Sequence, residues 1–151
     1  MSITVGDTAP DFSLQADDGS TFNLKSRRGH RVLLVFYPGD NTPVCTRQLC
    51  DYRDGAEAFA GLGVELIGIS PDGADSHSAF KAKHDLPFRL LADPDLAVAG
   101  AYGARGMLGM KRALFLVDEA GVLRWSHVES LALFRRAREE VLKAIEALDS
   151  A

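Results

Sequence analysis

The stretch VLLVFYPGDNTPVCTRQLC, residues 32–50, contains the pattern of a buried strand, a loop and the start of a helix. Residues 32–37 are a continuous apolar run rich in β-branched side chains, which is typical of a strand covered on both faces. Thr42 is favoured just before a helix and Pro43 at its first position, so the pattern predicts a helix that begins at Pro43. A buried strand that leads through a loop into a helix indicates an α/β fold.

Downstream of this unit, strand and helix patterns continue to alternate. After a helix expected over residues 43–62, the run VELIGIS at residues 64–70 indicates a second buried strand. A helix over residues 74–84, a short strand around residues 88–91 and a short helix over residues 95–102 follow. Such an alternating series predicts helices packed against a central sheet.

Two hairpins and a final helix complete the pattern. Residues 12–14 and 21–24 flank Asp18-Gly19, and residues 113–117 and 122–128 flank a second turn, whereas residues 103–109 are expected to be loop. The last helix carries one apolar stripe, made of Phe134, Ala137, Val141, Ile145 and Leu148. We therefore expect a single α/β domain over residues 1–151, with a mixed central β-sheet flanked by helices on both faces.

Composition and charge exclude several classes of protein. The 151 residues are 46% hydrophobic and 25% charged, with a formal net charge of −4, which argues against a surface for nucleic acid. The first residues lack a basic segment followed by an apolar run, so no secretory signal is expected. The apolar run at residues 32–37 is far shorter than the ~20 residues that a membrane-spanning helix needs. We therefore expect a cytoplasmic protein that binds neither nucleic acid nor membrane.

The chain has two cysteines, and the first falls in the first turn of the predicted helix. With Thr42 as the N-cap, Cys45 occupies the third helical position, beside free backbone N–H groups and the positive end of the helix dipole. This environment favours the thiolate, which is the reactive form of cysteine. The Thr42 hydroxyl is expected to lie close to the sulfur.

The second cysteine, Cys50, belongs to the same predicted helix. Five helical positions correspond to a rotation of about 140° and a rise of about 7.5 Å, which place the two Cα atoms roughly 9 Å apart. A disulfide requires Cα atoms closer than about 7 Å. Cys45 and Cys50 therefore either never bond or bond only when part of the helix unwinds.

Three interpretations of the cysteine pair remain open at this level. Cys50 could be a small core residue with Cys45 incidental, since free cysteine is often buried. A metal site needs more ligands, and the spacing of His77 and His84 completes none, so all four histidines are expected to be structural or at the surface. A reactive Cys45 with Cys50 as a second, resolving thiol fits the Thr-Pro helix start best.

The stretch from Pro38 to Cys45 resembles the P-x-x-x-T-x-x-C signature of the peroxiredoxins. The start VGDTAPDFSL, the segment GISPDG and the segment RALFLVDEAG resemble further landmarks of that family, in the same order. The placement of Cys50 five residues after Cys45 is similar to that in the peroxiredoxin Q subgroup, also called bacterioferritin comigratory protein. The resemblance implies a thioredoxin-like fold and a thiol-dependent peroxidase.

The resemblance also implies roles for individual residues. Cys45 would be the peroxidatic cysteine, which attacks the peroxide and becomes a sulfenic acid, and Cys50 would resolve it as a disulfide. The other implied site residues have supporting roles: Thr42 bonding sulfur and peroxide, Pro38 shielding the pocket, Arg112 stabilising charge, Gln48 ordering Arg112, and backbone N–H groups near Val44 and Cys45.

The same resemblance implies partners. The substrates would be hydrogen peroxide and organic hydroperoxides, thioredoxin or a similar dithiol would be the reductant, and no cofactor or metal is needed because sulfur carries the redox chemistry. A monomer is expected. Two alternatives use the same cysteines: a redox-switched binding or chaperone-like module, and a thiol-disulfide oxidoreductase, which the absence of a C-x-x-C motif disfavours.

Overall fold

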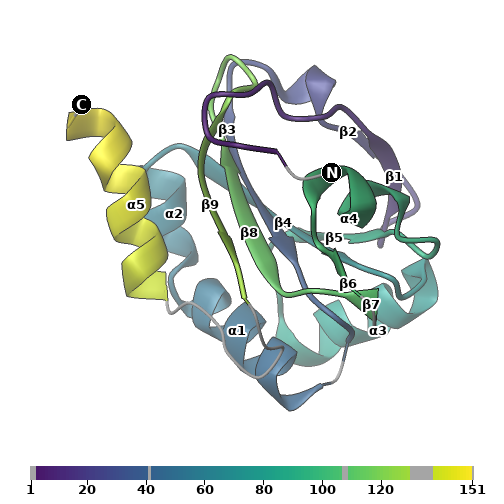
Figure 1. The fold of residues 1–151 in the computed structure, drawn as a ribbon. Coiled ribbons are helices and arrows are strands. Elements are labelled where there is room, and N and C mark those ends of the chain that lie inside the picture. The colour runs from purple at the N-terminus through teal and green to yellow at the C-terminus, as the bar shows by residue number, and fades with distance from the viewer. Residues whose placement is uncertain (1–2, 41, 107–108, 130–137, 151) are drawn as a thin grey trace.

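A seven-stranded sheet with strand order β2-β1-β5-β4-β3-β8-β9 runs through the centre of the molecule (Figure 1). The computed structural model describes residues 3–40, 42–106, 109–129 and 138–150. The strands are β1 (Ser13–Ala16), β2 (Thr21–Asn23), β3 (Arg31–Phe36), β4 (Val64–Ser70), β5 (Arg89–Ala92), β8 (Ala113–Val117) and β9 (Leu123–Val128).

The sheet is mixed, as predicted. Strand β4 pairs in parallel with β3 and with β5. Strand β8 pairs antiparallel with β3, and β1 pairs antiparallel with β5. The two predicted hairpins are the pairs β1–β2 and β8–β9. The apolar run that begins at Val32 lies in β3, which is paired with β4 on one edge and with β8 on the other.

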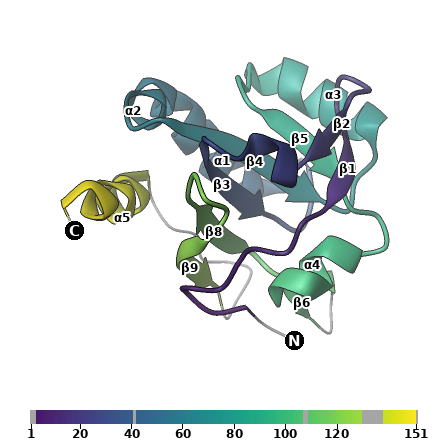
Figure 2. The same cartoon turned by 90° about the horizontal axis from the view of Figure 1, so that it is seen from above.

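Helices cover both faces of this sheet. They are the 3-10 helix η1 (Lys25–Arg27) and the α-helices α1 (Pro43–Asp54), α2 (Ala56–Gly61), α3 (Ala74–His84), α4 (Ala97–Tyr102) and α5 (Arg138–Ser150). Side chains alternate along β3, so that Leu34 packs in a cluster with Tyr102 of α4, while Leu33 packs in a second cluster with residues of α1, α2, α3 and α5. Figure 2 shows α4 on the other side of the sheet from α2 and α3.

One predicted helix is in fact two. The helix expected over residues 43–62 divides at Gly55, which ends α1 and begins α2 with φ −96° and ψ 10°. Glycine weakens a helix interior because its backbone loses more freedom than that of other residues. The backbone N–H groups of Ala58 and Phe59 both donate to the Gly55 carbonyl, so a new helix starts at once.

Other differences are smaller. The expected loop at residues 103–109 contains two short antiparallel strands, β6 (Arg105–Gly106) and β7 (Gly109–Met110). Gly109 has φ +112°, a conformation that side chains with a Cβ rarely adopt, which lets the chain turn back into β7. In the final helix Val141 and Ile145 are buried, while Phe134 and Ala137 of the predicted stripe lie outside the described residues.

Candidate active site

The β3–α1 connection carries the motif residues to one end of the sheet. β3 ends at Phe36 and α1 begins at Pro43, so Thr42 is the N-cap, with extended backbone angles of φ −81° and ψ 146°. This geometry confirms the predicted helix start and places Cys45 in the first turn of α1. The side chain of Cys45 is fully buried, with 0% exposure.

Arg112 directly precedes the neighbouring strand β8 and contacts Cys45 from there. Ala113 pairs with Phe36 across the β3–β8 ladder, so the residue before Ala113 lies beside the end of β3. Arg112 is 2% exposed, and its Nη1 donates to the Cys45 Sγ at 3.2 Å. Lys111 is exposed, as expected for adjacent residues that point to opposite sides.

Gln48 links Arg112 to the rest of α1. Its Oε1 accepts from Arg112 Nη1 at 2.9 Å, and its Nε2 donates to the Tyr52 hydroxyl at 3.2 Å. Gln48 and Tyr52 are both fully buried, and the Tyr52 ring packs edge-on against Phe59 at 5.8 Å between centroids. Sequence reasoning did not include Tyr52 among the site residues, although its spacing of four from Gln48 places both on one helix face.

The Thr42 hydroxyl is engaged with its own loop. It donates to the Gly39 carbonyl at 3.0 Å. The hydroxyl oxygen keeps lone pairs with which it can accept a further hydrogen bond. Pro38 and Val44 are half-buried on either side of this stretch.

Cys50 lies further along α1 than Cys45 and closer to the surface. Its side chain is partly exposed, and both cysteines are free thiols. Because α1 is continuous from Pro43 to Asp54, the spacing of about 9 Å between the two Cα atoms applies to this state. The helix must therefore open before the two sulfurs can bond.

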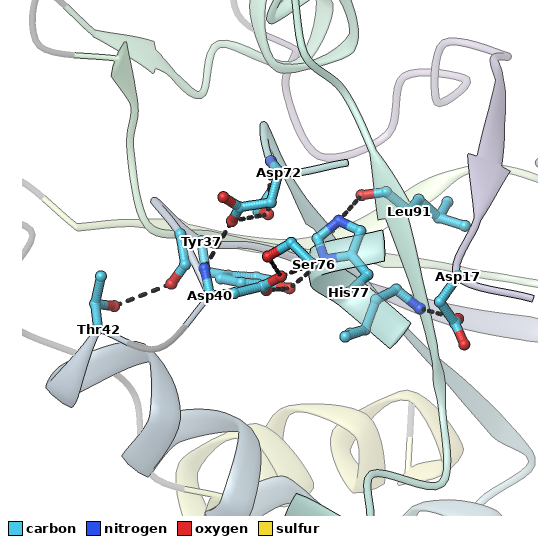
Figure 3. Close-up of polar contacts among 11 residues, drawn as sticks. Asp17, Tyr37, Asp40, Thr42, Asp72, Ser76, His77 and Leu91 are labelled. Atoms are coloured by element: carbon cyan, nitrogen blue, oxygen red, sulfur yellow. Dashed lines mark hydrogen bonds and ion pairs between the residues drawn. The ribbon is translucent and has the colours of Figure 1, made fainter. Parts of the chain in front are cut away.

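Behind the loop lies a buried polar cluster that sequence reasoning did not assign to the site. His77 Nδ1 lies 2.8 Å from Asp40 Oδ2, and the hydroxyls of Tyr37 and Ser76 donate to the same carboxylate at 2.7 and 2.8 Å (Figure 3). Burial raises the pKa of Asp40, but hydrogen bonds from His77, Tyr37 and Ser76 outweigh it and leave that pKa below its usual value. Burial raises the pKa of Tyr37 well above its usual value.

The described residues contain neither a group of metal ligands nor a membrane-spanning helix. Across residues 3–40, 42–106, 109–129 and 138–150, no three His, Cys, Asp or Glu side chains are grouped so that they could hold a metal ion. Within the same ranges, no helix has both the length and the apolar character needed to cross a membrane.

Comparison with known proteins gives consistent likenesses. The model of the AhpC/TSA family matches residues 5–126. Peroxiredoxin Bcp of Bacillus subtilis is 37% identical over 98% of this chain and 96% of its own length. The solved structure of Xanthomonas campestris peroxiredoxin Q is 26% identical with a TM-score of 0.85, covering 96% of both chains. A structure of the bacterioferritin comigratory protein of the same organism, described for its alkyl peroxide reduction activity, is 25% identical with a TM-score of 0.85 over 97% of both chains.

Proposed function

The chain belongs to the AhpC/TSA family and is a peroxiredoxin, a thiol peroxidase of the Bcp and Q type, and we propose that Cys45 is the thiol that attacks the peroxide. The observation that carries this proposal is the contact of 3.2 Å between the buried Arg112 guanidinium and the Cys45 sulfur. Cys50 is partly exposed, and its sulfur has no such contact among those described.

In the first step the Cys45 thiolate attacks one oxygen of the hydroperoxide and the O–O bond breaks. The sulfur is oxidised to a sulfenic acid, and the other oxygen leaves with the electron pair and takes up a proton to become water or an alcohol. Arg112 opposes the negative charge on sulfur at the start of the step and on the leaving oxygen at its end. A guanidinium suits this role because it stays charged and offers several donors.

Supporting groups come from the two ends of the same loop. Thr42 offers a hydroxyl oxygen that can accept from the peroxide, because its own hydrogen is directed at the Gly39 carbonyl. Backbone N–H groups near Val44 and Cys45 point out of the first turn of α1. Pro38 shields the sulfur from water.

In the second step the Cys50 thiol attacks the sulfenic sulfur of Cys45, a disulfide forms, and water leaves. This step requires α1 to unwind between the two residues. A dithiol reductant then attacks the disulfide and releases both thiols, while the reductant is itself oxidised to a disulfide. We propose a thioredoxin-type protein for this role.

The remaining elements of the proposal concern substrate and setting. Hydrogen peroxide and alkyl hydroperoxides both fit, since the similar Xanthomonas campestris protein is described for alkyl peroxide reduction. Both thiols lie on one helix of one chain, which supports a monomer that completes the cycle within the single domain of residues 1–151. The need for a dithiol reductant supports a cytoplasmic setting.

The direct test is peroxide consumption by the purified protein with a dithiol reductant. Wild type should consume hydrogen peroxide and cumene hydroperoxide catalytically, and Cys45→Ser should consume neither. Retention of most activity by Cys45→Ser would reject Cys45 as the attacking thiol. A wild-type protein that reacts with neither peroxide, yet changes partner binding on oxidation, would instead support a redox-switched binding module.

A further inference from the structure

The buried cluster behind the β3–α1 loop is built around one carboxylate and one imidazole. The side chain of Asp40 is 1% exposed and that of His77 is 0% exposed. Figure 3 shows the two side chains pointing toward each other between the loop and α3, with Ser76 beside them. Groups this deeply buried are kept charged only when they are paired and hydrogen-bonded.

Each ring nitrogen of His77 faces an oxygen atom. His77 Nε2 lies 3.0 Å from the Leu91 carbonyl oxygen, which can only accept, so Nε2 carries a proton. His77 Nδ1 faces Asp40 Oδ2 at 2.8 Å. The same carboxylate already accepts from the hydroxyls of Tyr37 and Ser76, and an array of donors favours its ionised form. Both ring nitrogens of His77 thus face acceptors, an arrangement that an imidazolium satisfies.

This pair is attached to the loop that carries the reactive residues. Asp40 lies two positions before the N-cap Thr42, and its backbone N–H donates to Asp72 Oδ2 at 2.7 Å. Asp72 in turn accepts from the Ser70 hydroxyl at 2.9 Å, at the end of β4. The loop is therefore joined through side chains to β4 and α3, and through His77 to the backbone of β5.

We propose that Asp40 and His77 form a positioning pair for the peroxidase reaction. Their buried carboxylate–imidazolium contact holds the β3–α1 loop at a fixed distance from α3 and so keeps Thr42 and the first turn of α1 in the arrangement that receives the peroxide. Neither residue touches the sulfur, and both act through the loop. This inference rests on the proposed function of Cys45.

Loss of the Asp40–His77 contact should affect two reactions of Cys45, peroxide attack and alkylation, to different extents. Peroxide attack requires the loop donors and acceptors to be aligned with the O–O bond, and a small misplacement of such groups costs about tenfold to hundredfold in rate. Alkylation by iodoacetamide requires the thiolate and a transient opening over the buried Cys45 sulfur, but no alignment of donors and acceptors with an O–O bond. Asp40→Asn and His77→Gln should therefore lower the single-turnover rate with hydrogen peroxide by about tenfold or more, while alkylation of Cys45 should change by no more than about twofold.

Matched controls are available on α3. Asp75→Asn repeats the carboxylate-to-amide change at an exposed position in the first turn, and His84→Gln repeats the histidine change in the last turn. Both should leave the peroxide rate at the wild-type value. Thermal melts verify that each variant is folded at the assay temperature, and a Cys50→Ser background limits the measurement to Cys45.

A spectroscopic reading checks the proton positions independently of activity. In protein labelled with ¹⁵N-histidine, the resonances lost in His77→Gln identify His77, and at neutral pH both of its ring nitrogens should show imidazolium shifts that Asp40→Asn abolishes.

Four results would overturn the proposal: a neutral His77 in wild type, unchanged peroxide rates in folded variants, equal losses in alkylation and peroxide attack, or equal losses in the α3 controls. Failure of the wild type to react with peroxide would instead refute the proposed function of Cys45. The wild-type rate therefore distinguishes failure of that function from failure of the positioning pair.

Discussion

Replacement of Arg112 by alanine should slow the reaction of Cys45 with hydrogen peroxide by a factor that the structure allows to be worked out. The Nη1 atom of Arg112 donates at once to Cys45 Sγ at 3.2 Å and to Gln48 Oε1 at 2.9 Å, in a setting where Arg112 is only 2% exposed. A buried hydrogen bond from a charged group contributes about 1.5–3 kcal/mol. Removal of one preorganised donor from a site of developing negative charge slows a reaction by about 10²–10³-fold. We expect a loss of that size in the second-order rate constant.

The assay is stopped-flow oxidation of the reduced protein by a range of hydrogen peroxide concentrations, with free thiol counted after quenching. Lys111→Ala is the matched control, because Lys111 is the adjacent cation but is exposed. Arg112→Lys should recover part of the rate, since it restores a positive charge without the planar fork of donors. Equal losses in Arg112→Ala and Lys111→Ala, or an Arg112→Ala rate within about threefold of wild type, would refute the assignment made from this contact.

Three further outcomes are expected. Cys50→Ser should react with one equivalent of peroxide to give a Cys45 sulfenic acid, and, because no resolving thiol is present, a second equivalent should over-oxidise it to the sulfinic acid, which mass spectrometry detects; equal amounts of sulfinic acid in the wild type would contradict the resolving role of Cys50. Hydrogen exchange over residues 44–53 should be much faster in the oxidised protein than in the reduced one, and equal protection with the disulfide verified would reject the unwinding step. Tyr52→Phe should reduce the free energy of unfolding by about 1–3 kcal/mol in urea titrations, because it leaves the buried Gln48 amide without an acceptor; an unchanged value would indicate that Gln48 finds another partner.

The parts of the fold that the sequence predicts are those with a local cause. The apolar run of β3 and the Thr42-Pro43 helix start depend on neighbouring residues only, and both appear where they are expected. The similar solved structures confirm the thioredoxin-like fold that the resemblance implies. The break at Gly55 has a weaker local signal, because a glycine within an otherwise helical pattern can be tolerated or can end the helix.

The contacts that complete the site have no local cause. Arg112 meets Cys45 across 67 positions of the chain, through the register that places Ala113 opposite Phe36. Periodicity predicts that β3 and β8 are strands but not that they are neighbours, and only the family resemblance singles out Arg112. His77 meets Asp40 across 37 positions, and the pattern of α3 gives no reason to distinguish it from the other histidines.

The contact between Arg112 and Cys45 also bears on how the chemistry leads to unwinding. In the proposed mechanism the Arg112 guanidinium attracts the Cys45 thiolate before the reaction and thereby holds the first turn of α1 against the start of β8. Attack on peroxide converts that thiolate into an uncharged sulfenic acid, so the attraction weakens at the moment when α1 has to open. The hydrogen bond from Arg112 to the neutral Gln48 acceptor involves no charge on the sulfur and is unaffected by this step. If Arg112 activates the sulfur as proposed, the same residue stabilises the helix before oxidation and releases it afterwards, which would let Cys50 approach only when there is a sulfenic acid to resolve.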